Sequence, residues 1–138
     1  MDWQVISHPF LVHFIVALYL SGFFLDVLAE MRGSEKLRFA AWMNHIGAAL
    51  GALGAVISGL IAKSHSLFVD EAVQLLERHE TAAFVVFALV AGQFFWRFSA
   101  KGQIPANSRW LYWLLSLLTV IVLLLTAHWG GRLMRGEW

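Results

Sequence analysis

The sequence has no cysteine and few charged residues. Without cysteine, the chain forms no disulfide, no covalent c-type haem attachment and no thiolate metal site. Asp, Glu, Lys and Arg make up 14% of the 138 residues, whereas a soluble domain has about 25%. The net charge is +1, and the chain contains no Walker-type glycine loop, GxSxG elbow or HExxH pair. These absences argue against nucleic-acid binding and against the soluble enzyme classes that those motifs mark.

The residues that are present are mostly apolar and fall into four long runs. Hydrophobic residues make up 59% of the chain, and the mean hydropathy is +0.68. A helix that spans a bilayer needs about 20 predominantly apolar residues. Four runs approach or exceed this length: 9–28, 39–62, 81–96 and 110–127. The third run is the shortest, but apolar residues at helical spacing before it predict a helix that starts well upstream, with Asp70 as its N-cap.

The four runs predict an all-α fold, an integral membrane four-helix bundle with an up-down-up-down arrangement. The segments 31–38 and 99–108 are short and contain Gly, Ser, Pro and Asn, which favour turns between antiparallel neighbours. We expect one domain over residues 1–138. No basic segment precedes the first run and no small-residue cleavage site follows it, so we expect the first helix to remain in the mature protein.

Lysine and arginine are divided unequally between the two ends of this predicted bundle. The end with the first and last connections has six, and the end with both termini has four. The six are Arg32, Lys36, Arg38, Arg97, Lys101 and Arg109; the four are Lys63, Arg78, Arg132 and Arg135. The positive-inside rule then predicts that both termini lie outside, which is the periplasm if the membrane is the inner membrane of a Gram-negative bacterium.

Five of the six histidines are predicted to meet at the end that carries the termini. His45 alone belongs to the other end. An ionisable residue inside a spanning segment is costly without a partner, and neutral imidazole ligates metal ions and haem iron. The cluster therefore predicts a cofactor site, with solvated histidines at the membrane interface as the alternative. The five residues are His8, His13, His65, His79 and His128.

We expect the cofactor to be haem b, held by His13 and His79. His13 lies more than a turn inside the first run, and the first and third helices of a square bundle are diagonal, so the two rings can approach an iron from opposite sides. His8 is about 140° from His13 around the helix and points elsewhere, which makes it the weaker candidate. His128 is the expected substitute, and His65 is its diagonal partner if a second haem binds.

Glycines in the second and fourth runs have two interpretations each. Gly130 and Gly131, in "TAHWGGRL", either end the fourth helix or let a large planar group approach the backbone. The glycines of the second run, Gly47, Gly51, Gly54 and Gly59, either make room for such a group or serve close helix packing, which is the ordinary use of a GxxxG pair like Gly47 and Gly51 in membranes.

Two polar residues inside the runs are expected to make structural contacts. Asp26 lies near the end of the first run and is predicted to pair with Asn44, His45 or Arg38 of the second helix. Gln93 is predicted to form an interhelical hydrogen bond.

Three short segments resemble a known bacterial family. "HPFLVHFIVAL" is similar to the His-Pro-x-x-Val-His-Phe-Pro-Ile-Ala-Leu opening of the predicted membrane proteins called domain of unknown function 2231. "ERHETAAF" resembles the start of that family's third helix, and "AHWGG" resembles the Gly-His-Leu-Gly-Gly segment of its last helix. Ile15 replaces the second proline of the opening motif. The resemblance implies four helices, and the association of some relatives with c-type cytochrome domains implies electron transfer.

The sequence thus predicts a small electron-transfer subunit in the lipid bilayer that binds haem b. Its expected partner is a periplasmic c-type cytochrome or a larger redox complex. Two alternatives remain open. The first is a structural subunit of a larger complex without a cofactor, and the second is a copper or zinc site on His13, His79 and His128.

Overall fold

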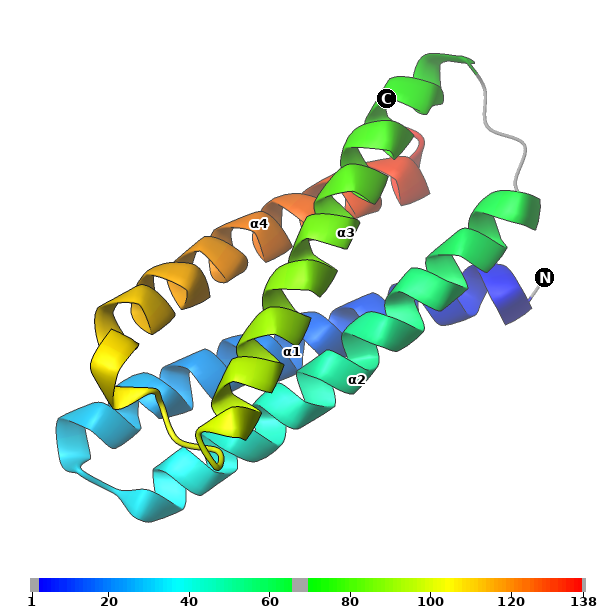
Figure 1. Cartoon of the computed structure of the whole chain (residues 1–138). Helices are drawn as coiled ribbons and strands as arrows, with labels where there is room; N and C mark the ends of the chain where they lie inside the picture. The colour runs from blue at the N-terminus through cyan, green and yellow to red at the C-terminus, as the bar shows by residue number, and fades with distance from the viewer. Residues whose placement is uncertain (1–2, 66–69, 138) are drawn as a thin grey trace.

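The computed structural model describes residues 3–65 and 70–137, which form four long α-helices and one short 3-10 helix (Figure 1). The described part of the chain has no strand, so the predicted all-α class is confirmed. The third helix starts well before its apolar run, also as predicted. The elements are α1 (Trp3–Arg32), α2 (Glu35–His65), α3 (Asp70–Ser99), η1 (Ala106–Ser108) and α4 (Arg109–Arg135).

The fourth helix does not end at its glycine pair. Gly130 and Gly131 keep helical backbone angles, and α4 continues to Arg135, so the expectation that they end the helix is wrong. The helix ends at Gly136, whose φ of +70° is a left-handed conformation that glycine adopts without steric cost. Its N–H donates to the Leu133 carbonyl at 3.3 Å and so satisfies one of the free carbonyls of the last turn.

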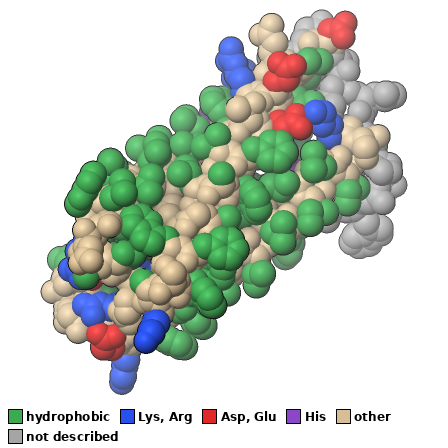
Figure 2. Space-filling view, viewed as in Figure 1, with side chains coloured by type: hydrophobic (Ala, Val, Ile, Leu, Met, Phe, Trp, Pro, Cys, Tyr) green, Lys and Arg blue, Asp and Glu red, His purple; other side chains and the backbone are tan. Residues whose placement is uncertain are grey.

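All four helices are long and apolar enough to cross a membrane. The candidate spans are 25 to 30 residues long, with a mean hydropathy between 1.5 and 2.2. Figure 2 shows apolar side chains over the middle of the bundle and charged side chains gathered at its two ends. This distribution fits a bilayer, because the hydrocarbon core excludes charge whereas the headgroup region accepts it.

Consecutive helices run in opposite directions along the bundle (Figure 1). Contacts between ring nitrogens and carbonyls place the start of α1 beside the end of α2, and the start of α3 beside the end of α4. Helix α1 packs against α2 and α4, and α3 packs against the same two helices. Helices α1 and α3 are therefore diagonal, as expected from the sequence.

The two halves of the bundle repeat each other with an offset of 71 residues. Buried residues of α1 at 15, 19, 22 and 26 correspond to buried residues of α3 at 86, 90, 93 and 97. Buried residues of α2 at 41, 45, 48, 52 and 55 correspond to buried residues of α4 at 112, 116, 119, 123 and 126. These matching positions show that α1–α2 and α3–α4 are similar helical hairpins, with exceptions at Ala29 and Ser58, which are buried whereas Ala100 and Trp129 are half-buried.

Contacts and residue identities follow the same offset. Trp42 of α2 stacks on Phe94 of α3, with ring centroids 5.5 Å apart. The residues 71 positions away from these, Trp113 of α4 and Phe23 of α1, also meet, at 5.9 Å. Identical residues at equivalent positions include His8 and His79, Phe24 and Phe95, Arg38 and Arg109, and Gly59 and Gly130.

The hairpins differ most in how closely their helices approach. A Cβ atom added to Gly47 would lie 2.9 Å from Leu18, and one added to Gly51 would lie 3.1 Å from Ile15. The GxxxG pair therefore serves close packing of α2 on α1, as predicted. The equivalent positions of α4 carry Leu118 and Val122, and α3 and α4 pack less closely.

Candidate functional site

A cavity of about 640 Å³ lies at the end of the bundle where α1 and α3 begin. All four helices line it, mostly with apolar side chains such as Val12, Leu60, Leu76 and Phe84. Cofactor sites in proteins are cavities of about 300–1,000 Å³ with apolar walls and a few polar groups. The polar groups here include three histidines, His8, His13 and His79.

The structure brings His8 and His79 together across the cavity. Their ring centroids are 6.2 Å apart, and the ring planes are nearly perpendicular, at 83°. Because a metal–imidazole bond is about 2.0–2.1 Å long, two rings that ligate one ion from opposite sides have centroids roughly 6 Å apart. The spacing of these two rings fits two ligands of one ion, and it also lies within the range of about 4.5–7 Å of an edge-to-face ring contact.

Backbone carbonyls set the tautomer of both rings. Nδ1 of His8 lies 3.1 Å from both the Ala55 carbonyl and the Ser58 hydroxyl, which itself donates to that carbonyl, and Nδ1 of His79 donates to the Thr126 carbonyl at 3.0 Å. A carbonyl only accepts, so Nδ1 carries the proton and Nε2 of the neutral ring carries the lone pair. A hydrogen bond from Nδ1 to a carbonyl is the usual support of a metal-ligating histidine.

Each ring fits against a glycine of the neighbouring helix. A Cβ atom on Gly59 would lie 2.9 Å from Cε1 of His8, and one on Gly130 would lie 2.8 Å from Cε1 of His79. Both distances are too short for a real side chain. Gly130 therefore makes room for the His79 ring, whereas the sequence suggested that it makes room for the cofactor itself.

The other candidate ligands lie apart from this pair. His13 lines the cavity but is exposed, and its Nδ1 lies 2.6 Å from the Pro9 carbonyl one turn back. His128 is exposed and is not among the described residues that line the cavity. The side chain of His65 lies outside the described part. Gly131 lines the cavity, and a Cβ atom there would meet only Arg135.

Among the described residues, no three His, Cys, Asp or Glu side chains converge as a metal-binding group. His13, His79 and His128, expected as the alternative copper or zinc ligands, thus form no such group in the part of the chain that is described. Of the histidines that line the cavity, His8 and His79 are the two whose rings contact each other.

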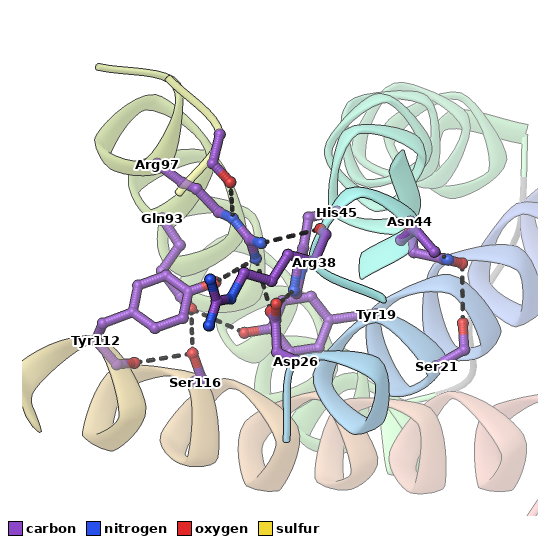
Figure 3. Close-up of polar contacts among 12 residues, drawn as sticks. Tyr19, Ser21, Asp26, Arg38, Asn44, His45, Gln93, Arg97, Tyr112 and Ser116 are labelled. Atoms are coloured by element: carbon purple, nitrogen blue, oxygen red, sulfur yellow. Dashed lines mark hydrogen bonds and ion pairs between the residues drawn. The ribbon is translucent and has the colours of Figure 1, made fainter. Parts of the chain in front are cut away.

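A second buried polar cluster lies at the opposite end of the bundle and joins all four helices (Figure 3). Asp26 Oδ2 of α1 accepts from Arg97 Nη1 of α3 at 2.6 Å and from His45 Nε2 of α2 at 2.8 Å. Arg97 also donates to the hydroxyl of Tyr112 on α4 at 3.1 Å, and to the Gly102 carbonyl. The predicted Asp26–His45 contact is confirmed, and Arg97 is a partner that the sequence did not reveal.

Gln93 extends this polar region toward the middle of the bundle. Its Oε1 accepts from Tyr19 at 2.9 Å and from Ser116 at 2.9 Å, and its Nε2 donates to Thr119 at 2.7 Å. These bonds connect α1, α3 and α4, which confirms the predicted interhelical role. Apolar core residues, among them Ile15, Ala52 and Leu123, separate this network from the histidine cavity.

The four helices are apolar enough to span a bilayer, and they enclose a buried polar cluster at one end and an apolar cavity at the other. This is the architecture of a multi-pass helical membrane protein. The chain belongs to the DUF2231 family of predicted membrane proteins, whose model matches residues 6–136. No curated protein and no solved structure matches the chain.

Proposed function

We propose that this protein is a membrane electron-transfer subunit that binds one haem b between His8 and His79. The observation that carries the proposal is the equivalence of the two rings. They occupy equivalent positions of the repeat, point Nδ1 at carbonyls 47 residues further along the chain, and lie 6.2 Å apart. His8 thus takes the place that the sequence suggested for His13.

The donor set fits haem. A porphyrin supplies four equatorial nitrogens, so the protein needs to contribute only axial ligands, and two imidazoles do this in low-spin b-type centres. His8 and His79 come from the diagonal helices α1 and α3 and would hold the iron between them. The apolar walls suit the macrocycle, which is largely hydrophobic.

The role of the chain's own residues follows from their contacts. Ala55 and Thr126 hold the two rings in the tautomer that presents Nε2, and Gly59 and Gly130 let the rings lie close to the helices. The bound iron would supply reversible one-electron chemistry. The partner remains as proposed from the sequence, a periplasmic c-type cytochrome or a larger redox complex at the end where the cavity lies.

The absorption spectrum of the protein purified from haem-replete cells tests this proposal. We expect a Soret band and sharp α and β bands after reduction, which mark low-spin haem with two histidine ligands. His8→Ala and His79→Ala should each lose the haem or convert it to a high-spin form. His128→Ala and His13→Ala are the matched controls and should leave the bands unchanged.

Three results would contradict the proposal in different ways. Full low-spin absorption in both His8→Ala and His79→Ala would exclude these ligands. Loss confined to His13→Ala and His79→Ala would restore the pair expected from the sequence. A colourless protein would exclude haem, and elemental analysis would then separate a copper or zinc site from a structural subunit.

A further inference from the structure

The two histidines are identical at equivalent positions of the internal repeat, but four residues that border the cavity, here called its rim, are not. Lys63 of α2 corresponds to Met134 of α4, and Glu80 of α3 corresponds to Pro9 of α1. All four residues line the cavity. One side of the rim is therefore charged, and its symmetry-related side is apolar.

The charged side is an ion pair between the end of α2 and the start of α3. Lys63 Nζ lies 2.7 Å from Glu80 Oε2, and the side chains are 48% and 28% exposed. Among the described residues that line the cavity, these two are the only ones with a formal charge. Lys63 is thus the one cation among the described lining residues, since Arg135, which lies beside the lining residue Gly131, is held by two hydrogen bonds to Glu137.

Lys63 lies where it can contact the edge of a ligand that is held between the two rings. It follows Gly59, which contacts His8, by four residues, so it lies about one helical turn of 5.4 Å farther toward the end of the bundle. Glu80 directly follows His79. The ion pair thus borders the site that the two rings define and does not lie between them.

We infer that the cavity takes an amphipathic planar ligand in one orientation, with its carboxylates at Lys63 and its apolar edge at Pro9 and Met134. This inference rests on the proposed function, because haem b is such a ligand: its two propionates share one edge, and the opposite edge is hydrocarbon. The two rings alone would accept the macrocycle in either of two orientations, with its carboxylates toward Lys63 or toward Met134. The difference between Lys63 and Met134 removes this ambiguity.

Binding in this orientation exchanges one partner of Lys63 for another. The Lys63–Glu80 pair is partly exposed, and such pairs contribute little to stability, so little is lost when a ligand carboxylate replaces Glu80. A charge-assisted hydrogen bond to the propionate takes its place. Glu80 then turns toward water, since it would otherwise repel the carboxylates.

The test compares the affinity of the apo-protein for haem and for haem dimethyl ester, in which both carboxylates are blocked. We expect the wild type to prefer haem about tenfold, the size of one charge-assisted hydrogen bond. Lys63→Met, which installs the residue of the symmetry-related position, should reduce the preference to about onefold. Lys63→Arg should retain it, and Glu80→Gln should increase it.

Two controls separate this inference from the proposed function. Lys36→Met removes a lysine from the other end of the bundle and should leave the preference unchanged. Low-spin absorption in Lys63→Met shows that the site is folded and ligated. An unchanged preference in Lys63→Met with intact low-spin bands would overturn the orientation and leave the haem proposal standing. Failure of the wild type to form a low-spin complex with either compound would overturn both.

Discussion

At the scale of single residues, two contacts between the hairpins join equivalent positions. His8 meets His79, and Asp26 meets Arg97, each pair separated by the repeat offset of 71 residues. Two like charges at equivalent positions that lie in contact would repel each other strongly in a medium without water. The opposite charges of Asp26 and Arg97 avoid this repulsion, whereas two neutral imidazoles are free to share an ion.

Asp26 and Arg97 are each 1% exposed, so removing one charge leaves the other buried without its counter-charge. We expect Asp26→Leu to lower the free energy of unfolding by about 3–5 kcal/mol, because an uncompensated buried charge is costly. The double variant Asp26→Leu/Arg97→Met should recover much of this loss. Denaturant-induced unfolding in detergent micelles measures both.

Glu30→Gln is the control, since Glu30 pairs with the half-exposed Arg109 at 2.8 Å and such a pair contributes about 0–1 kcal/mol. A double variant no more stable than Asp26→Leu would show that the charge of Arg97 is not what makes the single change costly.

Residue-level prediction from the sequence succeeded where the information is local. The angle between His8 and His13 follows from helix geometry, and the structure leaves His13 exposed and His8 half-buried against Gly59, although both line the cavity. Which of the two rings meets His79 depends on Gly59, which lies on another helix and admits the His8 ring. Arg97 was counted with the basic residues near a connection, because nothing near it in the sequence indicates that Asp26 is its partner.

At the scale of helices, the apolar runs and turn residues were sufficient to predict four helices and their approximate ends. The end of α4 was the exception. Glycine is permitted in a helix as well as after it, and the Gly130 contact that favours the helical form lies on α3. The repeat is difficult to see in the sequence because few positions are identical, although His8 and Phe23–Phe24 match His79 and Phe94–Phe95 at one offset.

The close approach of α1 and α2 depends on the small residues between them. Gly51→Leu should lower thermal stability in detergent, because overpacking costs about 1–3 kcal/mol and a Cβ atom there would already lie 3.1 Å from Ile15. Gly92→Leu is the matched control, since no atom lies within 4 Å of the added Cβ. Equal melting temperatures for the two variants would contradict a packing role for Gly51.

At the scale of the whole molecule, two hairpins of the same direction form one bundle with different contacts at each end. At one end, Asp26 and Arg97 join the hairpins. At the other, His8 and His79 meet, the wall is apolar and a cavity of about 640 Å³ remains.

The orientation of the bundle in the membrane decides which compartment the cavity faces. Six Lys and Arg at the end with the Asp26–Arg97 pair, against four at the cavity end, favour the cytoplasm for the former, because basic residues are retained on that side. A reporter that is active only in the periplasm should therefore give signal when fused after Trp138, and none when inserted within residues 33–36. A reporter that is active only in the cytoplasm should give the reverse pattern. Periplasmic signal from the 33–36 insertion alone would place the histidine cavity in the cytoplasm and exclude a periplasmic cytochrome as its direct partner.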